Sequence, residues 1–116
     1  MKTLTEKDVR FAIEIAPEDA SIEGNCSAID PETDAETEAY IKRELRNGNE
    51  WAWCVVKVTA SWKGHKGTDY LGACSYKSEA DFIAGGYFED MKRAALAELN
   101  DTIKRACNDL RELCEQ

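Results

Sequence analysis

The residues of this chain that could take part in chemistry are one histidine, His65, and five cysteines. A histidine close to a cysteine can activate the thiol for nucleophilic attack, and Cys54 and Cys74 are the candidates because both lie in strand-like runs. His65, however, lies between Lys63 and Lys66 in a glycine-containing turn, where an exposed imidazole without a catalytic partner is the ordinary outcome. We therefore predict no catalytic residue and expect that the chain is not an enzyme.

The cysteines do not follow a metal-binding or disulfide pattern. They are odd in number and none are spaced as Cys-x-x-Cys, so neither a zinc site nor a disulfide framework is indicated. The five are Cys26, Cys54, Cys74, Cys107 and Cys114. We expect reduced thiols that pack as small apolar side chains, with no metal and no cofactor. Glycine-rich phosphate loops, zincin helices and nucleophile elbows are also absent from the sequence.

Length and composition favour one domain, spanning residues 1–116, with a modest core. The chain is 43% hydrophobic and 33% charged, which is typical of a globular protein. No apolar run approaches the roughly 18 residues that a membrane helix needs, and the N-terminus lacks the layout of a signal peptide. We expect an intracellular protein that does not contact a membrane.

The predicted fold is organised around the run from Trp51 to Trp62, whose aromatic and β-branched residues favour a strand. One set of alternate positions is apolar and should face the core: Ala52, Cys54, Val56, Val58, Ala60 and Trp62. The other set begins with Trp51, Trp53 and Val55 and then turns polar. This second patch has two interpretations. It is either core covered by the first helix or by residues 16–30, or an exposed aromatic surface that binds a protein partner.

Two further strands and a helix surround this run. Residues 9–15 alternate as a half-buried strand that Pro17 ends. A turn at residues 63–67, with two glycines free to adopt positive φ, leads into a strand at residues 69–76. Gly72 within that strand suggests a bulge or the close approach of a bulky group such as a Trp. Asp30 and Pro31 are suited to begin a helix that ends at Asn47 or Gly48.

A short helix capped at Ser78 is interrupted at residues 85–86, and a long helix then runs from Tyr87 to the end of the chain. At about 1.5 Å per residue this helix could reach about 40 Å and overhang a small sheet. We expect an interface of a homodimer where its apolar stripe continues past the sheet. The residues of this seam are Ile103, Ala106, Leu110 and Leu113.

Together these elements predict an α+β fold of the order β-α-β-β-α. It is a two-layer sandwich in which a three-stranded, mainly antiparallel sheet carries two helices on one face, the short helix that begins at Asp30 and Pro31 and the long C-terminal helix. The second and third strands should form a hairpin. The long loop after the first strand allows that strand to pair at either edge.

The net charge of −8 is unevenly distributed. Residues 1–50 hold 13 acids and 6 bases, whereas residues 51–116 hold 10 acids and 9 bases. Between Phe11 and Ile41 there are nine acids and no Lys or Arg. Such a run is either a solvated face or a surface that imitates the phosphates of nucleic acid and occupies the basic groove of a partner. A protein that binds nucleic acid directly would normally carry the opposite charge.

Residues 50–100 resemble small proteins encoded by bacteriophages and prophages. The segments that carry the resemblance are Trp51-Ala-Trp-Cys54, Val58-Thr-Ala-Ser-Trp62, Asp69-Tyr-Leu-Gly-Ala-Cys-Ser-Tyr76 and Gly85-Gly-Tyr-Phe-Glu-Asp-Met91. Such small, acidic, non-enzymatic phage proteins include the anti-CRISPR inhibitors, which bind host nuclease complexes. The resemblance implies an inhibitor of a host nucleic-acid-handling complex in the cytoplasm of a bacterial host, and it assigns no role to any residue.

For such a protein the partner is a host protein or nucleoprotein complex with a basic groove, not free nucleic acid. We expect four acids of the first helix to contact that groove: Glu32, Asp34, Glu36 and Glu38. Trp51 and Trp53 are the alternative contact surface. The alternative function is a non-catalytic accessory or structural phage protein whose acidity serves only solubility.

Overall fold

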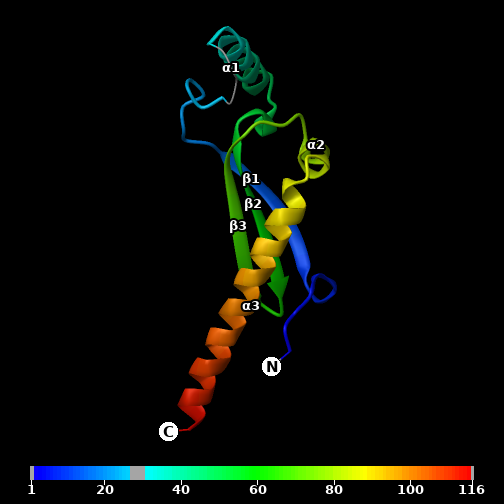
Figure 1. Cartoon of the computed structure of the whole chain (residues 1–116), viewed down its shortest axis with the longest axis vertical. Coiled ribbons are helices and arrows are strands. Elements are labelled where there is room, and N and C mark those ends of the chain that lie inside the picture. The colour runs from blue at the N-terminus through cyan, green and yellow to red at the C-terminus, as the bar shows by residue number, and fades with distance from the viewer. Residues whose placement is uncertain (1, 27–30, 116) are drawn as a thin grey trace.

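The structure, a computed structural model, describes residues 2–26 and 31–115, and of residues 31–33 it describes the backbone alone. An antiparallel sheet with the strand order β1-β2-β3 forms the middle of the molecule (Figure 1). The strands are β1 (Arg10–Pro17), β2 (Cys54–Trp62) and β3 (His65–Cys74), and the helices are α1 (Pro31–Arg46), α2 (Glu79–Ala84) and α3 (Tyr87–Cys114). Two short 3-10 turns are η1 (Glu6–Asp8) and η2 (Glu50–Ala52). The predicted α+β fold is confirmed.

β2 is the central strand, and its inward side chains form the middle of the core. Their alternation with polar residues predicts which of them are buried, and Cys54, Val56, Val58 and Ala60 are fully buried. β1 adds three half-buried side chains on the same face: Phe11, Ile13 and Ile15. α3 packs on this face of the sheet through Met91, Ala95 and Leu99, which are all buried. The core is therefore one layer of side chains between the sheet and a single long helix.

The backbones of α3 and β3 approach each other closely at Gly67. A Cβ atom on Gly67 would lie 2.3 Å from the Ala95 carbonyl oxygen and 2.3 Å from the Leu99 nitrogen. Helix backbone thus packs directly on strand backbone, which only a glycine permits. The prediction that Gly67 belongs to a turn is wrong. The turn consists of Lys63 and Gly64, with φ values of 47° and 84°, as in the two-residue turns that match the twist of a hairpin.

The central strand begins at Cys54, three residues later than Trp51, where the sequence predicted it. The Asn49 Oδ1 atom accepts a hydrogen bond from the Trp51 nitrogen at 3.2 Å and caps η2. Asparagine readily forms such local bonds to the backbone, which compete with strand pairing. The Trp51 side chain consequently points into an aromatic cluster instead of continuing the strand.

The aromatic cluster closes the end of the core beside α2. Phe82 is fully buried, and its ring centroid lies 5.7 Å from that of Trp51 and 5.2 Å from that of Tyr76. The Ser78 Oγ atom accepts a hydrogen bond from the Asp81 nitrogen at 3.2 Å and caps α2, as predicted. α2 thus covers, with Phe82, the end of the core that α3 does not cover.

The prediction that α1 lies on the face of the sheet is wrong. α1 stands beyond one end of the sheet and packs against η2 (Figure 1). It buries Ile41, but Tyr40 and Leu45 remain 40% and 36% exposed. The apolar stripe of α1 is too thin to cover a sheet, so the helix gains little by lying on one. The predicted cap at Asp30 lies outside the described residues.

At the opposite end α3 extends well past the sheet, as its length predicted (Figure 1). The molecule measures 65 by 26 by 25 Å, and its radius of gyration is 18.6 Å. A compact chain of this length would have a radius of gyration of about 13 Å. The N-terminal segment runs beside α3, where the Asn100 side chain bonds the Leu4 nitrogen at 2.9 Å and the Leu4 oxygen at 3.1 Å. The protein is therefore a rod with two distinct ends.

We predict that Gly67→Ala lowers the free energy of unfolding by about 3 kcal/mol, because the new methyl group meets rigid helix backbone and forces α3 off the sheet. Gly85→Ala is the matched control, since Gly85 has a φ of −73° and its Cβ would meet no atom closer than 3.4 Å. The control should change the free energy by less than about 1 kcal/mol. Denaturant titration measures both values, and equal losses would contradict the close contact at Gly67.

Candidate functional site

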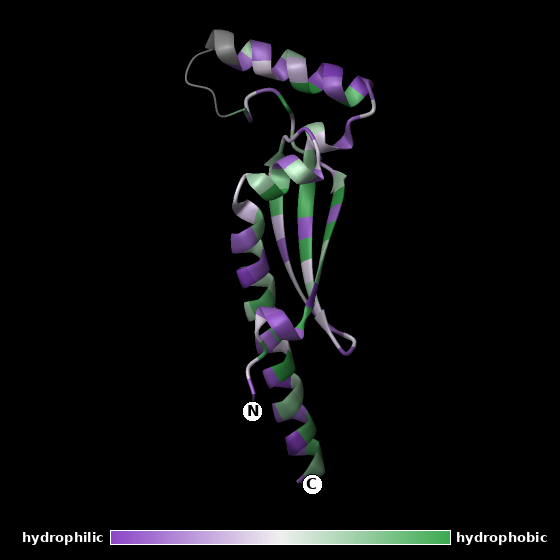
Figure 2. Cartoon of the chain, turned by 90° about the vertical axis from the view of Figure 1, so that its right-hand side faces the viewer, coloured by the Kyte–Doolittle hydropathy of each residue, from purple (hydrophilic) through white to green (hydrophobic). Residues whose placement is uncertain are grey.

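The negative charge of the molecule is concentrated at the end formed by α1. In residues 18–26 and 34–50 there are eight acids and three bases, whereas the sequence outside residues 18–50 has 13 acids and 12 bases. Hydrophilic residues cover most of α1, in contrast to the sheet (Figure 2). We call the surface of residues 18–26 and 34–50 the acidic end. It is the candidate partner-binding site.

Two of the four acids predicted to bind a partner already interact with other groups of this chain. The Glu38 Oε1 atom accepts a hydrogen bond from the Gly24 nitrogen at 3.1 Å and is half-buried. Asp34 is also half-buried and is not free of partners. Glu36 is exposed, and the side chain of Glu32 lies outside the described residues. The predicted set therefore does not form one free acidic face.

Other acids of this region also hold the loop before α1 in place. Glu23 forms an ion pair with Lys42 of α1 and accepts a hydrogen bond from the Ser21 hydroxyl at 2.8 Å. The bond from Lys42, followed by that from Ser21, lowers the pKa of Glu23 to about 2. Glu23 is therefore charged at neutral pH, and its contacts with Lys42 and Ser21 join the loop to the helix through an exposed ion pair, which is weak on its own.

Glu18 explains the glycine in the third strand. Its Oε1 atom accepts a hydrogen bond from the Ala73 nitrogen at 2.8 Å, and a Cβ atom on Gly72 would lie 3.1 Å from the same oxygen. The bulge predicted at Gly72 is confirmed by the register shift opposite Cys54 and by the positive φ of 52° at Ala73. The neighbour that comes close is a carboxylate and not a tryptophan.

The exposed aromatic patch that the sequence allowed is not formed. Trp53 is 6% exposed, and its Nε1 atom donates a hydrogen bond to the Ala20 oxygen at 2.9 Å. The loop after β1 therefore covers Trp53, as one of the two interpretations expected. Trp51 is half-buried against Tyr76 and Phe82. Trp53 therefore has little ring surface left for a partner, whereas Trp51 remains partly exposed.

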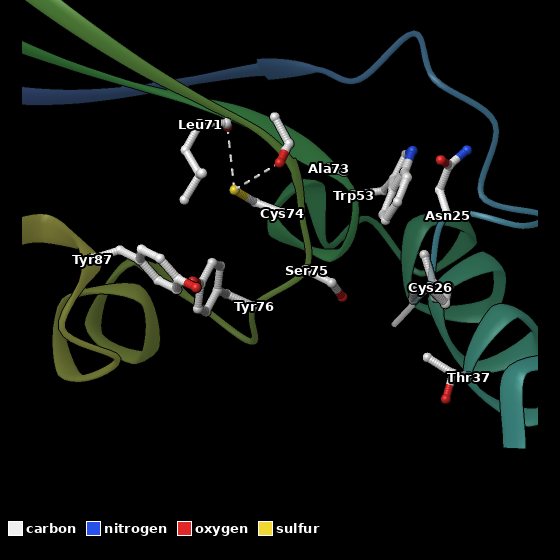
Figure 3. A pocket seen from close by; sticks show the side chains of 12 residues that line it. Asn25, Cys26, Thr37, Trp53, Leu71, Ala73, Cys74, Ser75, Tyr76 and Tyr87 are labelled. Atoms are coloured by element: carbon white, nitrogen blue, oxygen red, sulfur yellow. Dashed lines mark hydrogen bonds between the residues drawn. The ribbon is translucent and has the colours of Figure 1, made fainter. Parts of the chain in front are cut away.

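A cavity of about 370 Å³ lies between α1, the loop before it and the end of β3 (Figure 3). Its aromatic wall is made of Trp53, Tyr76 and Tyr87, and Asn25, Cys26, Thr37 and Ser75 add polar groups. No carboxylate, histidine, lysine or arginine is among the described residues that line it. Burial raises the pKa of Cys74, and burial together with Glu38 raises the pKa of Cys26. Both thiols stay protonated at neutral pH and are poor nucleophiles.

His65 does not meet either of the cysteines considered with it. Cys54 pairs with Cys74 at one end of the hairpin, while His65 pairs with Trp62 at the other. The imidazole stacks on the Trp62 ring at 6.2 Å between centroids, so it is half-buried and not the exposed group that the sequence suggested. Among the described residues, no three His, Cys, Asp or Glu side chains converge on a possible metal position.

The predicted seam on α3 is brought together at the end of the rod opposite α1. Leu110 and Leu113 are 62% and 66% exposed, and Ile103 and Ala106 are half-buried. Hydrophobic residues continue along α3 beyond the sheet (Figure 2). A groove of about 370 Å³ borders the seam, and sequence reasoning missed its other wall: Leu4, Trp62 and His65. The apolar Trp62 at a hairpin end was the signal that could have indicated it.

Comparison of the chain with protein-family models, with curated proteins and with solved structures finds no match in any of the three. No helix within the described ranges combines the length and the hydropathy needed to cross a membrane. What the described residues offer for function is thus an acidic end, an apolar end and, beside α1, the cavity with an aromatic wall.

We predict that Ellman's reagent at pH 8 modifies Cys114 rapidly but leaves Cys54 and Cys74 unmodified until the chain unfolds. Cys114 is exposed, whereas burial, and to a lesser extent Cys74, raises the pKa of Cys54 to about 12. Thiol release followed by absorbance measures the rates, and Cys114→Ser should remove the fast phase. Rapid modification of more than three thiols in the folded chain would show that the β2–β3 pair is open to solvent.

Proposed function

We propose that this chain is a phage-type binding protein that inhibits a host nucleic-acid-handling complex, in the manner of the anti-CRISPR inhibitors, by placing its acidic end in a basic groove of that complex. The observation that carries the proposal is the separation of charge along the rod. The described acidic end holds eight acids against three bases, while acids and bases nearly balance outside residues 18–50. The resemblance of residues 50–100 to small phage proteins supports the same function.

The position of α1 makes the acidic end accessible. Because α1 lies beyond the sheet and not on it, its outer side is free of the core (Figure 1). The molecule is only 26 by 25 Å across, so it can present this end to a concave surface without the rest of the rod colliding. Imitation of nucleic-acid phosphates by carboxylates would then bring the acids to Lys and Arg side chains that normally hold nucleic acid.

Six of the eight acids fall into two groups with different roles. Glu18, Glu23 and Glu38 fasten the loop and the bulge, so they shape the surface. Three exposed acids contact the partner: Asp19, Glu36 and Glu50. Each exposed ion pair contributes at most about 1 kcal/mol, so binding requires several acids together and weakens steeply with added salt.

We also propose that the protein is a homodimer held by the seam of Ile103, Ala106, Leu110 and Leu113. The seam is apolar and exposed at the end of the rod that lies farthest from α1 (Figure 1). A dimer formed there leaves both acidic ends available, so one assembly can engage two basic grooves.

Reversal of the exposed acids tests the function. We predict that Asp19→Lys/Glu36→Lys/Glu50→Lys loses the host complex that the parent chain retains from nuclease-treated bacterial lysate. The parent complex should dissociate at about 0.5 M salt, because salt screens the attraction between the acids and the basic groove. Duplex DNA should also dissociate it, because DNA competes for the same groove. Retained proteins are identified by mass spectrometry, and circular dichroism checks that the variant is folded.

The matched control is Glu6→Lys/Glu14→Lys/Glu98→Lys, which makes the same change of net charge at exposed positions away from the acidic end and from the tail of α3. It should retain the complex. If both triple variants bind as the parent does, the acidity serves solubility, and the chain is the non-catalytic accessory protein of the alternative reading.

A further inference from the structure

We propose that the second copy docks antiparallel on the tail of α3, residues 101–114, with its own tail seated in the groove at the end of the β2–β3 hairpin. This inference rests on the homodimer proposed above and gives it a definite geometry. The groove is mainly apolar, with Leu4, Trp62 and Ile103 in its walls, and the charged residues Lys2 and Asp8 also line it. The occupant of the groove is thus a helix of this same chain.

The single chain leaves an unusually large area uncovered. Its accessible surface is 7911 Å², whereas a compact monomer of 13.0 kDa would expose roughly 6,300 Å². The surplus of about 1,600 Å² exceeds the roughly 800 Å² that each partner buries in a stable interface of standard size. The tail of α3 extends past the sheet (Figure 1), and Leu110 and Leu113 on it are 62% and 66% exposed. The area available is therefore sufficient for a second copy.

The spacing of the seam is that of a helix that pairs with another helix. Leu96, Leu99, Ile103, Ala106, Leu110 and Leu113 follow one another at alternating steps of three and four residues. This is the a/d pattern of a coiled coil, which keeps one seam facing one partner. The sheet uses the first part of the pattern, where Leu99 is fully buried. The second part runs past the sheet with the same face turned toward the empty groove.

The position of the sheet selects the antiparallel orientation. The seam lies on the same stripe of α3 that packs on the sheet, so a partner helix on the tail occupies the side on which the sheet lies. A parallel partner would bring its own sheet to that side at the same height, where the first sheet already is. An antiparallel partner carries its sheet away in the opposite direction, and only the two tails overlap.

The side chains of the seam are complementary in that orientation. An antiparallel pair centred between Ala106 and Leu110 sets each Leu110 against the small Ala106 of the other copy. It also sets each Leu113 against Ile103, beside the groove wall formed by Trp62. Large residues thus meet small ones or a groove, which is the arrangement that knobs-into-holes packing requires. The two exposed leucines become the most buried contacts of the assembly.

The charges of the tail permit this contact. Residues 101–114 contain three acids and three bases, so two tails do not repel each other as two acidic ends would. The antiparallel arrangement places the acidic ends at opposite extremes of one long rod. Two rods of 65 Å that overlap by about 20 Å give a dimer about 110 Å long.

Small-angle X-ray scattering combined with light scattering tests the arrangement on the full chain at tens of micromolar. We expect a mass of about 26 kDa, twice 13.0 kDa, and a maximum dimension of about 110 Å. Leu110→Glu should give a folded monomer about 65 Å long, since Leu110 is 62% exposed in the single chain. Ile83→Glu, at a site 44% exposed on α2, is the matched control and should remain the long dimer.

The outcomes separate the two proposals. A parent chain that is a monomer under these conditions overturns both the homodimer and its geometry. A dimer whose maximum dimension stays near 65 Å overturns the antiparallel tail and leaves a homodimer of another kind. A Leu110→Glu variant that remains a long dimer also overturns the seam, because a buried charge at its centre could not be accommodated.

Discussion

At Gly67 the backbone of α3 rests on the backbone of β3 with no side chain between them, and this contact sets the course of the helix across the sheet. Ala95 and Leu99 lie at the contact, where one glycine and one small side chain allow the close approach. α3 has 28 residues and is longer than the sheet, so a helix fixed at Gly67 must extend past the edge of the sheet. The overhanging tail, the groove beside it and the elongated shape all follow from the seat of α3.

The parts of the fold that depend on local pattern could be predicted from the sequence. The alternation in β2, the glycine interruption before α3 and the a/d spacing of the tail each act over a few residues, so the sequence displays them directly. What depends on distant contacts could not be predicted. The sequence does not indicate that Gly67 meets α3, that Glu18 meets Ala73, or that Asn100 holds Leu4.

The candidate site shows the same division. The run of acids can be read from the sequence, but its position beyond the end of the sheet cannot, because the sequence predicted α1 on the face of the sheet. The sequence could not indicate which acids bind other groups of the same chain. The hydrogen bond from the Gly24 nitrogen to Glu38, for example, joins two residues that only the folded loop brings together. Trp53 could not be assigned from the sequence either, because an aromatic residue is suited equally to a core and to an interface. Only the structure shows that the loop with Ala20 covers it.

The two ends of the molecule have different proposed roles, because the acidic end meets a partner and the apolar end is completed by a second copy. Amide hydrogen exchange along α3 tests the apolar end most directly. A tail without cover would fray, since a helix segment of this length is marginal in water. In the dimer, we expect the amides of residues 103–111 to be protected nearly as well as those of residues 91–99. Protection that stops just after Leu99 in the parent chain would contradict it.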